Sequence, residues 1–344
     1  MDKPLGKRSG GPGGGTRATL RTISELTGLS QSTVSLALRG GERLKPETYK
    51  RVAEVAAEVG YVPDRAGVRL RTGKSNVITL VLERTDETID FARFLIQGIG
   101  RAIRGTRYHL NVTTEFGTGD SVEAIRYIMT NRTADGVIIT HTKARDARVQ
   151  LLMEAGYPFV THGRTEFQDA HPYVDFNSEE FVRLAVERMV QKGRKRLLMV
   201  AGPDVTFNFQ TIAAAYRRAI AAAGIHGELV SPPTDRTGPA RMREFGREIA
   251  AMNPAPDGII CDNEVNSIFM IAGLIDGGLT LKDVHFICKQ TSNILPALYP
   301  EIDTIEEDVL AAGRQLADVL IRTVGGESPE NLRVLTEPNP HWRS

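Results

Sequence analysis

The sequence predicts an N-terminal all-α head with a helix-turn-helix, a short hinge helix, and a larger C-terminal α/β region made of two Rossmann-like subdomains. Two short helical patterns separated by Gly28 predict the helix-turn-helix within residues 19–38. From residue 76 onward, short runs of β-branched residues alternate with helical patterns, which is typical of parallel sheets covered by helices on both faces. The length of 344 residues is enough for two or more domains.

The composition is that of an ordinary globular protein, with 41% hydrophobic and 25% charged residues. No apolar run is long enough to cross a membrane, and Lys3, Lys7 and Arg8 are not followed by the apolar core of a secretory signal. Cys261 and Cys288 show neither a disulfide framework nor metal-ligand spacing, which fits a reducing compartment. We therefore expect a cytoplasmic protein without membrane contact and without a bound metal.

Charge is distributed unevenly along the chain. Residues 1–75 contain 14 Lys and Arg against 7 Asp and Glu, whereas the remainder is acidic and the whole chain carries a net charge of +1. A basic head on an acidic body suits contact with phosphates at one end only. A positively charged, solvated surface without a partner is the alternative explanation.

Residues 1–18 are expected to form a disordered, glycine-rich tail, because they include the run Gly10-Gly11-Pro12-Gly13 and few apolar residues. A phosphate-binding loop is not expected there, since no strand precedes the glycines and no Gly-Lys-Ser/Thr follows them.

Residues 19–63 are predicted to form the DNA-binding domain with three helices. Thr19 or Thr22 begins the first helix as its N-cap, Ser30 begins the second, and Pro46 opens the third in the first-turn position that proline favours. The expected core consists of apolar residues at helical spacing, namely Ile23, Leu26, Leu29, Val34, Leu38, Leu44, Val52 and Val55.

Residues 64–75 are predicted to be a hinge. Asp64 can cap a short helix over residues 65–71, and Gly73 ends it. So short a helix is unstable alone in water, so we expect it to be disordered unless a partner holds it.

Residues 76–344 are expected to form the ligand-sensing domain. Strands are predicted over residues 77–82, 109–115, 136–140, 158–161, 173–176, 196–201, 258–261 and 284–288. Helices are predicted over residues 91–103, 122–129, 149–155, 181–191, 209–223, 242–252, 265–274 and 309–323. We assign residues 76–162 and 292–325 to an N-subdomain, and residues 163–291 and 326–344 to a C-subdomain. Ligands in such folds bind at the carboxyl ends of the strands, here in the cleft between the subdomains.

A specific resemblance rests on the head. Thr33-Val34-Ser35 in the second helix is followed, without gaps in the spacing, by a third helix that ends in Gly60-Tyr61-Val62-Pro63. With these motifs, the chain from about Thr19 to Ser344 resembles the lac repressor/galactose repressor (LacI/GalR) family of bacterial transcription regulators. The resemblance implies a periplasmic-binding-protein-like sensor and a homodimer on a pseudopalindromic operator in double-stranded DNA. It also implies a small-molecule effector, in most members a sugar, and repression of sugar uptake or catabolism genes.

Other functions stay open at this point. A corepressor-dependent or activating member of the family would have the same sequence features. A cytosolic sugar-binding or catalytic protein with an incidental basic head is the alternative from another class. No hydrolase, metalloprotease, redox or nucleotide-binding motif occurs, so we expect neither an enzyme nor a cofactor.

The resemblance implies that the second helix lies in the DNA major groove. Gln31 and Ser32 would face base edges, where Gln pairs well with adenine. The residues implied to contact phosphates are Thr19, Ser30, Thr33, Ser35, Lys45 and Thr48. Leu20, Arg39 and Tyr61 complete the implied contact set. Helix capping and solvent exposure are the alternative roles of the Ser and Thr residues.

Two leucines bear on the sequence that the head would recognise. Leu36 stands where the family usually has an arginine that reads guanine, so the operator is expected to differ at that base pair. Leu70 matches the hinge leucine that family members insert into the minor groove, which unstacks a base step and bends the duplex. Gly67, where the family prefers alanine, lowers the helix propensity of the hinge by about 1 kcal/mol.

Candidate effector-binding residues follow strands of the sensing domain. They are Asp90, Phe91, His141, Arg164, Phe209, Asn263, Glu264 and Gln290. Aromatic faces combined with carboxylate, amide and guanidinium groups are typical of sugar pockets, although a structural role is equally open for each residue. Ile212 and Gln290 stand where many members carry an arginine and an aspartate, so the pocket chemistry is expected to differ from that of the best-known relatives.

Overall fold

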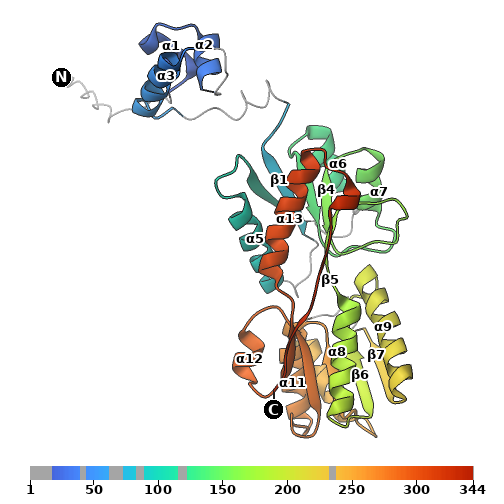
Figure 1. Cartoon of the computed structure of the whole chain (residues 1–344). Coiled ribbons are helices and arrows are strands. Elements are labelled where there is room, and N and C mark those ends of the chain that lie inside the picture. The colour runs from blue at the N-terminus through green and yellow to red at the C-terminus, as the bar shows by residue number, and fades with distance from the viewer. Residues whose placement is uncertain are drawn as a thin grey trace, which may run out of the picture. The chain divides into compact units, whose positions relative to one another are not determined.

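The computed structural model describes residues 18–38, 44–61, 73–82, 89–114, 122–231 and 238–343, without the side chains of residues 89 and 90. The chain forms two compact units, Met1–Ser75 and Asn76–Ser344 (Figure 1). Among the described residues, no helix is both long enough and apolar enough to cross a membrane.

The first unit contains the three predicted helices, α1 (Leu20–Thr27), α2 (Gln31–Ala37) and α3 (Pro46–Glu58). Thr19 is the N-cap of α1, where its hydroxyl and that of Thr22 each accept a hydrogen bond from the other residue's backbone N–H. Gly28, with φ of 68°, takes the left-handed conformation that ends α1. Ser30 caps α2 by accepting a hydrogen bond from the Thr33 N–H. Local capping therefore sets the spacing of the two helices.

A small apolar core joins the three helices. Its buried members are Ile23, Val34, Ala37, Val52 and Ala56. The prediction that Leu26 belongs to this core is wrong, because 57% of Leu26 is exposed. The buried stripe of α1 runs through Ile23 and Thr27, one turn apart, and Leu26 projects beside it. The predicted hinge helix over residues 65–71 lies outside the described residues.

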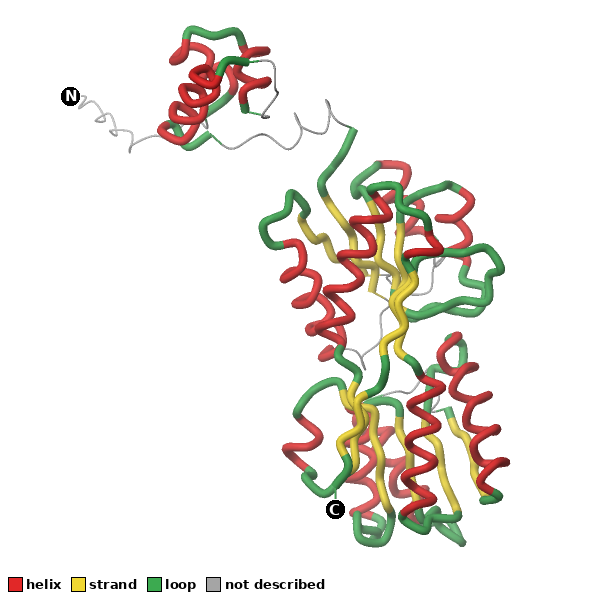
Figure 2. The backbone as a smooth tube through the Cα atoms, in the orientation of Figure 1, coloured by secondary structure: helices red, strands yellow, loops and turns green. Residues whose placement is uncertain are grey.

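The second unit has two six-stranded sheets, which Figure 2 shows as separate groups of strands. The first sheet has the order β11-β5-β4-β3-β1-β2, with all pairs parallel. Its strands are β1 (Val77–Leu82), β2 (His109–Thr114), β3 (Gly136–Ile139), β4 (Phe159–His162), β5 (Tyr173–Phe176) and β11 (Arg333–Thr336). Its helices are α5 (Ile89–Ile103), α6 (Glu123–Asn131), α7 (Ala147–Glu154) and α13 (Val309–Val324).

The second sheet has the order β12-β10-β9-β8-β6-β7, with only the β10–β12 pair antiparallel. Its strands are β6 (Arg196–Val200), β7 (His226–Val230), β8 (Gly258–Cys261), β9 (His285–Gln290), β10 (Asp303–Glu306) and β12 (Asn339–His341). Its helices are α8 (Ser178–Gln191), α9 (Phe207–Ala223), α10 (Pro239–Ala250), α11 (Glu264–Asp276) and α12 (Ile294–Leu298). A 3₁₀ turn, η2 (Pro329–Asn331), precedes β11 of the first sheet. The predicted head and two parallel-sheet α/β subdomains are thus confirmed.

The subdomain boundaries differ from those predicted. Strands β5 and β11 pair within the first sheet, so residues 163–176 and 326–336 belong to the first subdomain. Strand β10 pairs with β9, so residues 292–306 belong to the second. The chain therefore crosses between the subdomains after β5, after β10 and after β11. Strands β7, β10, β11 and β12 are not predicted from the sequence, because their segments HGELV, DTIE, RVLT and NPH contain no more than two consecutive apolar residues.

Glycine allows α5 and α13, which lie side by side in Figure 1, to pack closely. A Cβ at Gly98 would lie 2.2 Å from the Leu310 carbonyl oxygen and 2.9 Å from the Gly313 Cα. Both neighbours are backbone atoms, so the helices would have to separate.

We expect Gly98→Ala to lower the free energy of unfolding by about 1–3 kcal/mol, because overpacking displaces backbone. Gly100→Ala is the matched control in the same helix. A Cβ at Gly100 meets nothing within 4 Å, so this change should stabilise by up to about 1 kcal/mol through helix propensity. Urea unfolding of the two variants measures both effects, and equal stabilities would contradict the proposed packing role of Gly98.

Candidate functional site

The described part of the head presents a polar surface at the start of α2. Gln31 and Ser32 are exposed. The Ser30 Oγ lies 2.7 Å from the Ser32 Oγ and 2.8 Å from the Thr33 Oγ1. These hydroxyls can exchange their mutual hydrogen bonds for bonds to an external partner, because each both donates and accepts.

The other predicted DNA contacts differ in exposure. Thr19, Ser30 and Lys45 are exposed, whereas Leu20, Thr33, Ser35, Leu36, Thr48 and Tyr61 are partly buried. Leu20 and Tyr61 pack against the core of the head. Arg39 and Leu70 lie outside the described residues.

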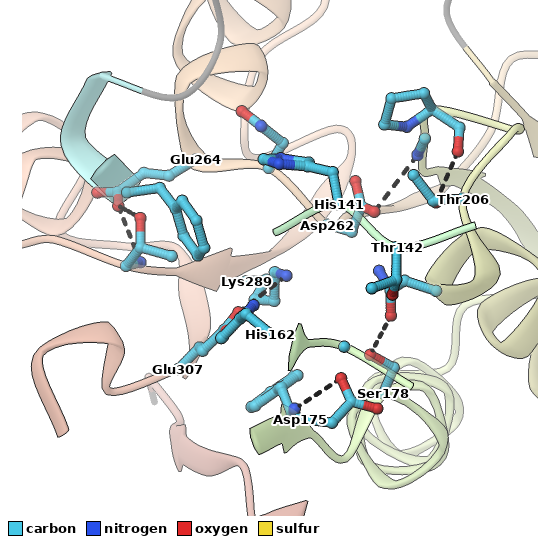
Figure 3. Close-up of a pocket in the computed structure, with 18 of the residues that line it drawn as sticks. His141, Thr142, His162, Asp175, Ser178, Thr206, Asp262, Glu264, Lys289 and Glu307 are labelled. Carbon is cyan, nitrogen blue, oxygen red and sulfur yellow. Dashed lines mark hydrogen bonds and ion pairs between the residues drawn. The ribbon is translucent and has the colours of Figure 1, made fainter. Parts of the chain in front are cut away.

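In the second unit, a cavity of about 150 Å³ lies where the carboxyl ends of strands from both sheets meet (Figure 3). It has room for on the order of ten water molecules. The lining residues are Phe91, His141, Thr142, His162, Gly163, Asp175, Phe176, Ser178, Gly202, Pro203, Thr206, Asn208, Asp262, Asn263, Glu264, Val265, Lys289, Thr291 and Glu307. Most of them lie at the carboxyl end of a strand or within a few residues after it, which is where ligands bind in open α/β sheets.

A charged cluster joins the two subdomains inside this cavity. The Lys289 Nζ, from β9, lies 3.0 Å from the Glu307 Oε2, which follows β10. The His162 Nε2, from β4 of the other sheet, lies 3.5 Å from the Glu307 Oε1. Burial alone would lower the pKa of Lys289, but the nearby carboxylates of Glu307 and Asp262 together outweigh it and raise that pKa. Burial likewise opposes ionisation of Glu307, yet Lys289 and His162 keep its pKa below the usual range. Lys289 and Glu307 are therefore an ion pair at neutral pH.

His141 lies opposite this cluster in a strained backbone position. Its φ of 53° is left-handed, which is uncommon for a non-glycine residue. Burial, assisted by the positive charges around it, lowers the pKa of His141 to about 4, so the ring is neutral near pH 7. Phe91 meets the rings of His141 and His162 edge-on, with centroids 5.8 and 5.2 Å apart.

A buried arginine supports the His141 backbone. Arg148 donates from Nε and Nη2 to the two carboxylate oxygens of Asp146, at 3.0 and 2.7 Å. Its Nη2 also donates to the carbonyl oxygens of Thr140 and His141, each at 3.2 Å. Arg148 and Asp146 are each only 2% exposed. This Arg148–Asp146 clamp therefore fixes the turn that presents His141 to the cavity.

Thr142 connects the two subdomains directly. Its carbonyl accepts a hydrogen bond of 2.9 Å from the Phe207 N–H, at the start of α9. Its hydroxyl donates to the Arg164 carbonyl at 2.8 Å. A ligand beside Thr142 would therefore contact a link between the subdomains.

Four of the predicted effector residues line the cavity, namely Phe91, His141, Asn263 and Glu264. The Glu264 carboxylate is engaged within the protein, since it accepts hydrogen bonds from the backbone N–H groups of Thr291, Ser292 and Leu295 and from two hydroxyls. Its main role is to hold the loop after β9.

Three of the other predicted effector residues, Arg164, Phe209 and Gln290, are not among the residues that line the cavity. The Arg164 side chain contacts the lining residue Asp175, to which its Nε donates at 2.6 Å, and its carbonyl accepts the hydrogen bond from Thr142. Phe209 packs into the core against α8. Gln290 hydrogen-bonds to Thr304 and Asn293. The backbone of Asp90 lies in α5, and its side chain lies outside the described residues.

Sequence reasoning missed several lining residues, among them Thr142, Asp175, Asp262, Lys289 and Glu307. Lys289 precedes the predicted Gln290, and successive side chains of a strand point to opposite faces. The alternation in β9 therefore decides which of the two reaches the cavity. Glu307 could not be found from its neighbours, since β10 itself was not predicted.

Comparisons with known proteins agree with this architecture. Residues 19–64 match the family described as bacterial regulatory proteins, lacI family, and residues 186–344 match the periplasmic binding protein-like domain. The HTH-type transcriptional regulator AglR of Rhizobium meliloti (strain 1021) is 31% identical over 328 residues, which cover 90% of each chain. CelR of Thermobifida fusca is 26% identical over 332 residues, covering 93% of this chain and 96% of CelR.

Solved structures share the fold. The lac repressor dimer bound to operator and the anti-inducer ONPF superposes with a TM-score of 0.80 at 18% identity, covering 94% of this chain and 98% of that one. A transcriptional regulator CelR–cellobiose complex gives a TM-score of 0.70 at 23% identity, covering 95% and 99%. The similarity to AglR spans both the head and the sensing domain, and the chain therefore belongs to the LacI family of bacterial regulatory proteins.

Proposed function

We propose that this LacI-family protein is a repressor of sugar uptake or catabolism genes, whose affinity for operator DNA is controlled by a sugar in the sensor cavity. The observation that carries the proposal is the combination, in one chain, of a head with an exposed polar helix start and a polar cavity between two subdomains. CelR, which binds cellobiose in its solved complex, supports a sugar as effector. The protein acts in the cytoplasm, where the DNA is, and needs no cofactor or enzymatic step.

The head reads DNA as a homodimer on a pseudopalindromic operator, because two heads need two half-sites. Gln31 and Ser32 face base edges in the major groove, and Thr19, Ser30, Thr33, Ser35, Lys45 and Thr48 hold phosphates. Leu20, Leu36, Arg39 and Tyr61 complete the surface, and Leu70 acts as the minor-groove wedge.

Effector binding controls the head by changing how the subdomains close. The Lys289–Glu307–His162 cluster and the hydrogen bond from Phe207 to Thr142 both join the two subdomains at the cavity. A ligand that favours one arrangement shifts the dimer between states of different DNA affinity.

Gln31→Ala should weaken operator binding about 10- to 100-fold, since a good bidentate contact to a base contributes about 1–3 kcal/mol. The Gln31→Ala variant should also discriminate less between bases at one base pair of each half-site. Lys45→Ala is the contrasting change, because loss of a phosphate contact weakens binding to all sequences alike and reduces the salt dependence. Equal losses on operator and random DNA for Gln31→Ala would contradict base reading by this residue.

Selection of bound DNA from random sequence, repeated with a panel of sugars, tests the whole proposal. We expect a pseudopalindrome whose recovery falls when the effector is present. A site without two-fold symmetry would contradict the dimer. Recovery that rises with a sugar would identify a corepressor-dependent regulator instead.

A further inference from the structure

The charged side chains that line the cavity are each engaged by partners within the protein. Among the described lining residues, the carboxylates outnumber the one lysine, and none of these residues is an arginine. Lys289 is paired with Glu307, and Asp175 with Arg164. The Glu264 carboxylate accepts hydrogen bonds from the loop after β9. Asp262 accepts a hydrogen bond from the Gly202 N–H at 3.3 Å.

This arrangement disfavours an anionic ligand. A phosphate or carboxylate near Lys289 would have to displace Glu307, which would leave a carboxylate buried without its partner, and it would also face Asp262. The aromatic rings of Phe91 and Phe176 add apolar surface beside these groups.

We infer that the cavity selects an uncharged, polyhydroxylated ligand and rejects the phosphorylated or carboxylated form of the same molecule. This inference rests on the proposed effector function of the cavity. A hydroxyl both donates and accepts, so it joins the contacts of Lys289, Glu307 and His162, gathered together in Figure 3, without breaking the ion pair. The cavity therefore binds neutral saccharides in preference to their phosphates.

Calorimetric titration of the full chain with matched sugars tests the inference. The probes are cellobiose, maltose and glucose, each paired with its 6-phosphate, together with glucuronate. The neutral sugar that binds best should bind about 100-fold more tightly than its phosphate, because placing like charges together costs several kcal/mol and about 1.4 kcal/mol is a factor of ten. Tighter binding of a phosphate or of glucuronate would overturn the inference and leave sugar sensing intact. Binding of none of these probes would count against the proposed function itself.

Two substitutions test whether the Lys289–Glu307 ion pair causes the discrimination against phosphates, and they should change it in opposite directions. Glu307→Gln frees the ammonium of Lys289 and should reduce the preference for the neutral sugar by about tenfold or more. Lys289→Gln removes the cation and should increase that preference. An unchanged preference in both variants would overturn the inference, and the second variant still provides a test if the first does not fold.

Glu306→Gln is the matched control for Glu307→Gln. It makes the same change one residue away, where the carboxylate accepts hydrogen bonds from His341 and Asn339 outside the cavity lining. The ratio of the affinities for a sugar and for the corresponding sugar phosphate should be the same in Glu306→Gln as in the unmodified protein. Thermal unfolding of each variant, followed by circular dichroism, verifies that the comparison is made on folded protein.

Discussion

Arg148→Met should lower the free energy of unfolding of the sensing domain by about 3–5 kcal/mol, the range for removing one partner of a buried ion pair. The substitution leaves the Asp146 carboxylate buried, and its remaining hydrogen bonds come from the backbone N–H groups of residues 143 and 148. It also leaves the Thr140 and His141 carbonyl oxygens without the Arg148 donor. Because this donor supports the turn at His141, affinity for the effector should fall as well.

The pH dependence identifies the cause of this instability. Burial would raise the pKa of Asp146, but hydrogen bonds from Arg148 outweigh it and keep the pKa below its ordinary value. In the unmodified protein, ionised Asp146 therefore stabilises the fold above the unfolded-state pKa of about 4, and this contribution is lost as the pH falls through the folded pKa. In Arg148→Met the folded pKa rises instead, so acidification from about pH 7 to about pH 5 should reduce the stability difference between variant and parent.

Arg145→Met is the matched control for the clamp. Arg145 pairs with Glu166 on the surface, and its side chain is 85% exposed. Exposed pairs contribute about 0–1 kcal/mol, so this variant should unfold close to the parent. Chemical unfolding at both pH values measures the two variants, and a pH-independent loss for Arg148→Met would show that packing, not charge, carries the effect.

Leu36→Arg should change the base preferred at one position of each half-site, with guanine favoured by about 1–3 kcal/mol, or roughly 10- to 100-fold. Leu36 lies on α2 and is only partly buried. The buried side of α2 is formed by Val34 and Ala37, so the longer side chain has a path to solvent without disturbing the core. Leucine itself offers a base edge no hydrogen bond and can touch only an apolar group such as the thymine methyl.

Leu26→Arg is the matched control for this substitution. It adds the same charge to the same unit at a leucine that is 57% exposed on α1. It should strengthen binding to all DNA sequences alike, with greater salt dependence, and leave the preferred site unchanged. Selection from random DNA compares the two variants, and an unaltered site for Leu36→Arg would contradict the position of Leu36 at a base edge.

The candidate sites were predictable to different extents. In the head, Gln31 and Ser32 are exposed as expected, because helix caps at Thr19 and Ser30 and the turn at Gly28 are local signals in adjacent residues. In the sensing domain, the expectation that aromatic and polar residues near strand ends meet in a cleft led to Phe91, His141 and Asn263. It failed for Phe209 and Gln290, because the direction of a side chain depends on packing with distant segments.

Local signals along the chain are sufficient to identify the class of protein. Capping residues, helical periodicity and strand–helix alternation act over a few residues, so they can be read along the chain. The pairing of β5 and β11 within the first sheet, and of β10 within the second, is seen only in the folded protein. This pairing brings Glu307 between Lys289 and His162. Strand pairing and the charge balance of the cavity depend on residues far apart in sequence, and only folding brings these residues within contact distance.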